Sequence, residues 1–176
     1  KNGRRVVLID SNSENISKSK NLGLEAFEAN VYSDDLLEDV EFNDIGYLLA
    51  LTGSSEVNDY VIEKFTDDFG EQGSFRLIST DELKDGIQKS NGTFFTHNDD
   101  YINLSEVVRD FPLVNEVIVE SGEHYNKALA EINNEFHAIP LFLKDKTGFI
   151  HIISSLNGER EIENGEVLVY VGKTVI

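Results

Sequence analysis

The run Val-Val-Leu-Ile-Asp at residues 6–10 limits the possible folds of this chain more than any other feature. Four apolar residues that favour β-structure predict a buried strand, and the run ends in the carboxylate of Asp10. In α/β proteins, ligands bind beyond the carboxyl ends of parallel strands, where this carboxylate would lie. Only five residues precede Val6, and they contain no glycine-rich loop of the kind that binds phosphate. We therefore expect an α/β fold in which Asp10 marks the ligand-binding edge.

The first half of the chain alternates short apolar runs with amphipathic stretches. Strands are expected at residues 6–9, 25–29, 47–51 and 75–78, and helices at 13–22, 34–40 and 56–69. Ser13 is the expected N-cap of the first helix, and Gly23 is expected to end it. The run at 47–51 is hydrophobic enough to predict a strand buried on both faces. Strands joined by helices of this length favour a parallel sheet.

The middle of the chain is less regular, and we interpret it as a connector. A helix is expected at 82–88, whereas 92–101 is largely polar. The connector is expected to carry contacts between domains or between subunits.

The last third changes character and predicts a small α+β module. Strands are expected at 115–119, 138–143, 149–153 and 166–171, with one helix at 124–132. Turn signals lie at 145–148 and at Asn164-Gly165. Because the last three strands follow one another without helices between them, this module is expected to be distinct from the first half.

Composition excludes several classes of function. The formal net charge of −18 argues against binding to a nucleic-acid backbone, which needs clustered Lys and Arg. The absence of cysteine excludes disulfides, thiolate nucleophiles and Cys-ligated zinc. No apolar run approaches the length of a transmembrane helix, so no membrane insertion is expected. The acidic residues are spread along the chain, which favours a solvated acidic surface over a collected metal site.

Patterns typical of enzymes are also missing from the sequence. The four histidines, at 97, 124, 137 and 151, lack metal-ligand spacing, and no serine lies in a G-x-S-x-G motif. Tyr60 and Lys64 have Tyr-x-x-x-Lys spacing, but they lie inside the predicted amphipathic helix. The acidic pairs are expected on solvated faces; they are Asp34-Asp35, Asp67-Asp68 and Asp99-Asp100. We therefore expect no catalytic activity.

Two segments resemble known domains. The strand ending in Asp10, followed by the stretch EAFEANVYSDDLLEDVEFNDIGYLLALTGSSEVN, resembles the RCK (TrkA-N) domains that regulate potassium channels, potassium-uptake systems and some sodium/proton antiporters. The stretch NEVIVESGEHYNKALAEINNEFHAIPLFLKDKTGFIHIISSLNGEREIENGEVLVYVGK resembles the RCK-C (TrkA-C) module that accompanies them. The resemblance implies a partial Rossmann-like parallel sheet at 1–80, a connector at 81–112 and an RCK-C-like domain at 113–176.

The resemblance also implies a nucleotide site that takes NAD(H) or an adenine nucleotide. Its residues would be Asp10 at the ribose, Asn12 and Ser13 near the adenosine, Asn30 and Val31 beside the adenine, and Thr52 and Gly53 at the middle of the nucleotide. Two alternatives remain open on the residues alone. Asp10 is either a ribose ligand or a turn or capping residue. The segment 52–55 either cradles a phosphate or forms a strand-to-helix turn with Ser54 or Ser55 as N-cap.

The sequence departs from the family pattern at three places. Asn30 stands where the family has Asp, and Glu166 follows Gly165 where a Gly-Asp pair is common. The family's first strand and its glycine-rich loop have no counterpart, so the site is expected to lack its phosphate-binding half. Three outcomes are open for the sheet: strands 6–9 and 47–51 pair directly, a partner chain fills the place between them, or this half is partly rearranged.

Taken together, the resemblance implies a cytoplasmic regulatory domain at the inner face of the cell membrane, attached to a monovalent-cation transporter. A sodium/proton antiporter is preferred to a potassium channel as the parent protein. The expected partners are further copies, as a homodimer or higher homo-oligomer, and the membrane-embedded transporter domain. Two rivals remain: an interaction module with a degenerate nucleotide site, and a fragment of an NAD(P)-dependent oxidoreductase.

Overall fold

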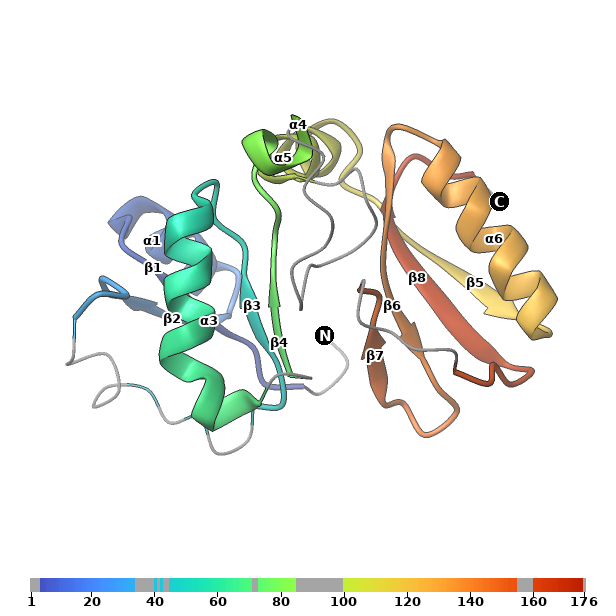
Figure 1. Ribbon diagram of the computed structural model, residues 1–176, viewed down its shortest axis with the longest axis horizontal. Coiled ribbons are helices and arrows are strands. Elements are labelled where there is room, and N and C mark those ends of the chain that lie inside the picture. The colour runs from blue at the N-terminus through green and yellow to red at the C-terminus, as the bar shows by residue number, and fades with distance from the viewer. Residues whose placement is uncertain are drawn as a thin grey trace.

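The computed structural model describes residues 4–33, 40, 42, 45–70, 73–84, 100–154 and 160–175. Figure 1 shows two halves side by side, with helices α4 (Thr80–Lys84) and α5 (Tyr101–Asp110) at the top of the view between them. Among the described helices none is long and apolar enough to cross a membrane.

The N-terminal half consists of two parallel β-α-β units. The first unit contains β1 (Val7–Asp10), α1 (Ser13–Asn21) and β2 (Glu25–Glu28); the second contains β3 (Leu48–Ala50), α3 (Ser55–Phe69) and β4 (Ser74–Arg76). Strand β1 pairs with β2, and β3 pairs with β4, both in parallel. The prediction of parallel strands joined by helices is therefore confirmed.

Strands β1 and β3 belong to separate two-stranded sheets. Of the three outcomes left open for the sheet, direct pairing of these two strands is therefore excluded. Side chains from both strands nevertheless contact one apolar cluster around Phe65 of α3, including Ile9 of β1 and Ala50 of β3. One helix thus holds the two sheets together through side-chain packing rather than through backbone hydrogen bonds.

Two local predictions in this half need correction. The N-cap of α1 is Asn12, not Ser13, because the extended Asn12 places its Oδ1 to accept from the Glu14 amide at 2.9 Å. The stretch 47–51 is not buried on both faces, since Leu49 and Leu51 are 40% and 39% exposed. The end of α1 at Gly23, which has a φ of 76°, agrees with the prediction.

The connector contains a helix that the sequence interpretation missed. Helix α4 covers the start of the predicted helix at 82–88, whose remainder lies outside the described residues. The helix predicted at 34–40 also lies outside them, except for the buried Val40. Helix α5 was not predicted. Its N-cap, Asp100, also forms a parallel bridge with Ile78, so α5 starts beside the end of β4.

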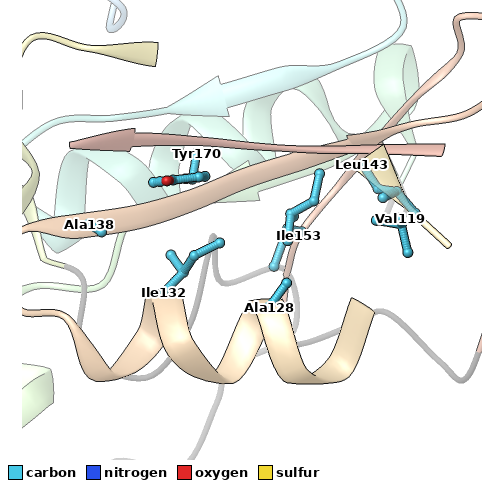
Figure 2. Close-up of a cluster of buried hydrophobic side chains, with 8 residues drawn as sticks. Val119, Ala128, Ile132, Ala138, Leu143, Ile153 and Tyr170 are labelled. Carbon is cyan, nitrogen blue, oxygen red and sulfur yellow. The ribbon is translucent and has the colours of Figure 1, made fainter. Parts of the chain in front are cut away.

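The C-terminal half has the predicted α+β composition. It consists of β5 (Val114–Val119), α6 (Gly122–Asn134), β6 (Ala138–Lys144), β7 (Ile150–Ile152) and β8 (Glu166–Gly172). The four strands form an antiparallel sheet in the order β5-β8-β6-β7. Figure 2 shows α6 lying along one face, where Ala128 and Ile132 pack against Tyr170 and its neighbours in the sheet.

The opposite face of this sheet joins the two halves of the molecule. One apolar cluster combines Leu77 next to β4, Val107 of α5, and Ile139 and Val171 of the C-terminal sheet. The hydroxyl of Tyr47, just before β3, donates to the Ile150 carbonyl at 2.7 Å. The partial burial of the Tyr47 side chain raises the pKa of this hydroxyl. The halves therefore share a hydrophobic core, which favours their unfolding as one unit.

The turn between β6 and β7 is organised by Asp145. Its Oδ1 accepts from the Thr147 hydroxyl at 2.6 Å and from the Phe149 amide at 2.9 Å, while Oδ2 lies 3.1 Å from Nε2 of His151. These hydrogen bonds hold the pKa of the Asp145 carboxyl well below its usual range. The bond from Thr147 has the largest effect, and the bond to His151 has the next largest. The guanidinium of Arg4 reaches the same turn and donates to the Gly148 carbonyl.

This lowered pKa predicts a specific dependence of stability on pH. Because the folded-state pKa lies below the unfolded value of about 3.9, Asp145 stabilises the fold fully above that value, and the contribution is lost as pH falls below it. We expect Asp145→Asn to reduce the difference in free energy of unfolding between pH 7 and pH 3, measured by urea denaturation. Asp67→Asn removes the same charge from an exposed site on α3 and is expected to leave that difference unchanged. Equal pH profiles for wild type and Asp145→Asn would refute the assignment.

Candidate functional site

All seven predicted site residues lie at or just after the carboxyl end of a strand. Asp10 is the last residue of β1, and Asn12 and Ser13 come after it. Asn30 and Val31 follow β2, and Thr52 and Gly53 follow β3. In the pair β1-β2, Asp10 lies in register with Glu28, and the Ala29 amide donates to the Asp10 carbonyl at 3.1 Å. The structure thus brings the Asp10 and Asn30 segments together, while Thr52 and Gly53 belong to the second sheet.

The carboxylate of Asp10 organises the turn into α1. Its Oδ1 accepts from the Asn12 amide, and its Oδ2 accepts from the Asn15 side chain, both at 2.8 Å. Asp10 therefore has the turn role, which was one of the two roles left open by the sequence. A carboxylate has about four lone-pair positions, so the half-buried group retains capacity to accept from ribose hydroxyls. Asn15 was not predicted, although its position in the first turn of the expected helix was a usable signal.

The turn after β2 is anchored to α3. The Asn30 side chain accepts from the Tyr32 amide at 3.0 Å, and the ammonium of Lys64 donates to the carbonyls of Val31 and Ser33 at 3.0 and 2.8 Å. The Tyr32 ring lies 4.6 Å from that of Tyr60. Lys64 therefore connects the first β-α-β unit to the second beside the predicted adenine-binding residues.

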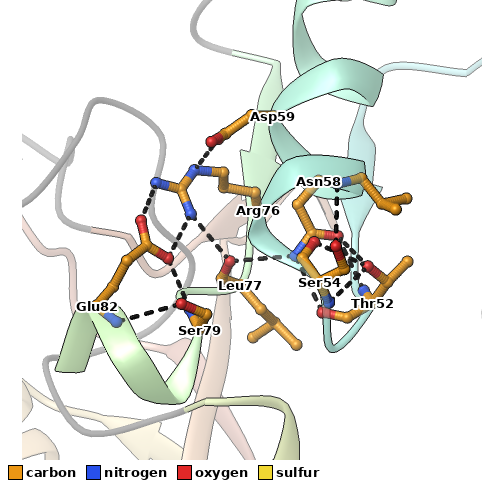
Figure 3. Close-up of polar contacts among 9 residues, drawn as sticks. Thr52, Ser54, Asn58, Asp59, Arg76, Leu77, Ser79 and Glu82 are labelled. Carbon is orange, nitrogen blue, oxygen red and sulfur yellow. Dashed lines mark hydrogen bonds and ion pairs between the residues drawn. The ribbon is translucent and has the colours of Figure 1, made fainter. Parts of the chain in front are cut away.

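The loop after β3 is held by Asn58, a side chain 1% exposed on α3. Its Oδ1 accepts from the amide and the hydroxyl of Thr52 at 3.0 and 2.8 Å, and its Nδ2 donates to the carbonyls of Thr52 and Leu77 (Figure 3). This residue was missed as part of the site. The signal was available, because Asn58 lies three and seven residues before Val61 and Phe65, on the buried stripe of the helix.

Thr52 to Ser55 form the strand-to-helix turn that was the alternative to a phosphate cradle. The Ser54 hydroxyl accepts from the Val57 amide at 3.3 Å, which makes Ser54 the N-cap of α3. The Thr52 amide donates to Asn58, so it is already engaged. The N-cap prediction is confirmed.

A buried arginine extends this network beyond β4. Arg76 forms an ion pair of 2.8 Å with Asp59 and one of 2.7 Å with Glu82, and it donates to the Leu77 carbonyl. The hydrogen bond from Arg76 lowers the pKa of Glu82. Glu82 and Ser79 also exchange hydrogen bonds between side chain and amide, which fixes the start of α4. Figure 3 shows these contacts continuing from those of Asn58.

The contacts of the histidines and of Asp100 indicate structural roles for these residues. The described histidines lie next to local partners, such as the Glu120 amide for His124 and Asp145 for His151. Within the described residues no cluster of three or more His, Asp or Glu could hold a metal ion. The prediction that Asp100 lies on a solvated face is wrong. Asp100 is buried, and its carboxylate is satisfied there by hydrogen bonds from the Asn103 amide and the Thr80 hydroxyl at 2.8 and 2.6 Å.

Residues 1–85 match the family model of the TrkA-N domain. The matched segment contains all four strands of the N-terminal half and all seven predicted site residues. TrkA-N domains are NAD-binding regulatory domains of ion-transport systems. The chain matches no curated protein. The resemblance of the first segment is therefore confirmed, whereas the RCK-C resemblance of the last third stays a prediction.

Proposed function

We propose that this chain is the nucleotide-sensing regulatory part of a monovalent-cation transporter, with a sodium/proton antiporter as the preferred parent protein. NAD(H) or an adenine nucleotide would bind at the carboxyl ends of β1 and β2. The observation that carries this proposal is the TrkA-N match over the segment in which Asp10 ends β1 beside the Asn30 turn. An acidic residue at this position accepts hydrogen bonds from ribose hydroxyls in dinucleotide-binding folds.

The proposed mechanism requires no chemistry. A nucleotide that binds one conformation more tightly than another shifts the population toward the first, by no more than its difference in binding free energy. The shared core between the N-terminal and C-terminal halves supports such coupling, because a change at the sheet edge reaches the C-terminal half through packed side chains. In a homodimer or larger ring, the same shift would act on the membrane-embedded transporter domain.

The two rivals differ in what they need from the structure. An oxidoreductase would need Lys64 to assist Tyr60, but the Lys64 ammonium donates to two backbone carbonyls and lies 5.7 Å from the centre of the Tyr60 ring. These contacts favour a structural lysine. An interaction module with a degenerate site is supported by the engagement of Asp10 within its own turn. Nucleotide binding separates this second rival from the sensor.

The decisive measurement is calorimetric titration with NADH, NAD, ATP and ADP. It is made on residues 1–176 and on a version with about 30 further residues before Lys1 that supply a strand and a glycine-rich loop. We expect the version with the loop to bind at least one nucleotide. In that version Asp10→Ala should weaken binding by roughly tenfold to hundredfold, because hydrogen bonds to a charged group contribute roughly 1.5–3 kcal/mol.

Glu28→Ala is the matched control for Asp10→Ala. Glu28 is the exposed acid in register with Asp10 on β2, so its removal changes the charge of the same sheet edge equally. It is expected to leave the affinity within about twofold, as is usual for exposed charges. Absence of binding by both versions would exclude the sensor and favour the interaction module.

A further inference from the structure

An aromatic ring from α5 lies close to Gly53 of the candidate site. A Cβ added at Gly53 would lie 3.2 Å from Cδ1 of Tyr101 and 3.5 Å from Cγ. The φ of Gly53 is not positive, so its backbone conformation does not itself require glycine. What the position requires is space, because the Tyr101 ring rests directly on the backbone of the loop.

The loop beneath the ring is fixed from the other side. Asn58 binds the amide, hydroxyl and carbonyl of Thr52, and the Thr52 hydroxyl also interacts with the amide and carbonyl of Ser54. Gly53 lies between these two anchored residues. The loop therefore cannot move away from Tyr101 without breaking the partly buried hydrogen bonds between Thr52 and Asn58.

The base of the ring is equally well fixed. Asp100, the preceding residue, caps α5 through the Asn103 amide, accepts from the Thr80 hydroxyl and bridges to Ile78. The Tyr101 side chain nevertheless remains 45% exposed. Part of the ring is thus available to a molecule bound at the carboxyl end of β3.

Helix α5 connects this ring to the C-terminal sheet. Val107, which is fully buried, and Leu104 pack in the cluster that contains Ile139 and Val171. Figure 1 shows α5 above both halves, next to α4. A single ten-residue helix therefore contacts the candidate nucleotide loop at its first residue and the C-terminal half along its body.

We propose that Tyr101 is a residue of the nucleotide site, supplied by α5, and that a nucleotide bound beside Gly53 contacts its ring and thereby orders α5. This inference rests on the proposed function and adds to it the element that reports binding to the C-terminal half. The ring offers stacking and van der Waals contact, for which a planar base or a nicotinamide ring is the fitting ligand chemistry.

The test combines calorimetry with amide hydrogen exchange on whichever version, residues 1–176 or the one with the loop, binds NADH or ADP. In wild type, the nucleotide is expected to slow exchange both in 50–55 and in α5. Tyr101→Ala is expected to weaken binding about tenfold, the usual effect of losing an aromatic stacking contact, and to abolish the protection of α5. Tyr101→Phe should behave like wild type, because the ring is retained.

Ile102→Ala is the matched control. It removes an equally exposed side chain, 53% exposed, from the next position of the same helix. It is expected to preserve both the affinity and the protection of α5. Unchanged affinity in Tyr101→Ala would overturn the inference, and so would wild-type protection confined to 50–55, while both results leave the proposed function standing. If neither version binds a nucleotide, the proposed function and this inference fail together.

Discussion

Leu77→Ala is expected to lower the free energy of unfolding by about 3 kcal/mol, as for other fully buried leucines truncated to alanine. Leu77 is 0% exposed and lies in the cluster that contains residues from β4, α5 and the C-terminal sheet. Because this cluster joins the halves, its loss should also separate their unfolding. Urea denaturation followed by hydrogen exchange should then show 48–76 and 138–144 opening at different denaturant concentrations.

Ile132→Ala provides the comparison for Leu77→Ala. Ile132 is also 0% exposed, but it packs in the cluster between α6 and its own sheet. Its truncation should cost a similar free energy, about 3 kcal/mol, while the two halves still open together. Identical opening behaviour in the two variants would show that the shared cluster does not determine cooperativity.

Asn58→Leu is expected to destabilise the protein by about 3 kcal/mol and to abolish nucleotide binding at the loop after β3. The substitution keeps the approximate volume but leaves the Thr52 amide and the carbonyls of Thr52 and Leu77 without their buried partner. Each unsatisfied buried group costs about 1–3 kcal/mol, and the partial exposure of Thr52 recovers some of that cost. Thermal and urea denaturation measure the first effect, and calorimetry measures the second.

Thr52→Ala separates the hydroxyl from the rest of this network. It removes the 2.8 Å bond to Asn58 and the exposed contacts of the hydroxyl with the Ser54 amide and carbonyl, but it leaves the bonds of the Thr52 backbone to Asn58 in place. A loss of about 1 kcal/mol is expected. In the double variant, Thr52→Ala should cost less than it does alone, because the Asn58 acceptor is already gone and only the exposed contacts with Ser54 are lost. Additive losses would mean that Asn58 and the Thr52 hydroxyl act independently.

The elements predicted correctly were those with strong local signals. The helix at 56–69 was visible because Val57, Val61, Phe65 and Phe69 recur every four residues, and all of them lie in or against the core. The C-terminal strands were bounded by turn signals such as Asn164-Gly165, and Gly165 has a φ of 93°. In these segments the local pattern and the tertiary environment favour the same structure.

The features that the sequence did not predict depend on contacts between distant segments of the chain. Helix α5 is stabilised by the C-terminal sheet and starts at a bridge between Ile78 and Asp100, neither of which its own sequence shows. Asp100 was expected to be exposed like Asp67, but it is buried and accepts a hydrogen bond from Thr80, twenty residues away in the chain. Within the candidate site, the sequence identified the positions that follow strands. It did not identify Asn58 or Tyr101, which reach those positions from helices.

The order of strands in the C-terminal sheet has a consequence for how the chain is made. Strand β8, which follows the other three strands in the chain, lies between β5 and β6 and pairs with both. While the chain emerges from the ribosome, β5 lacks its described partner strand until residues 166–172 become available. The first β-α-β unit, by contrast, closes within residues 7–28. The N-terminal half can thus form strand pairs early, whereas the sheet that carries α6 must wait for residues 166–172.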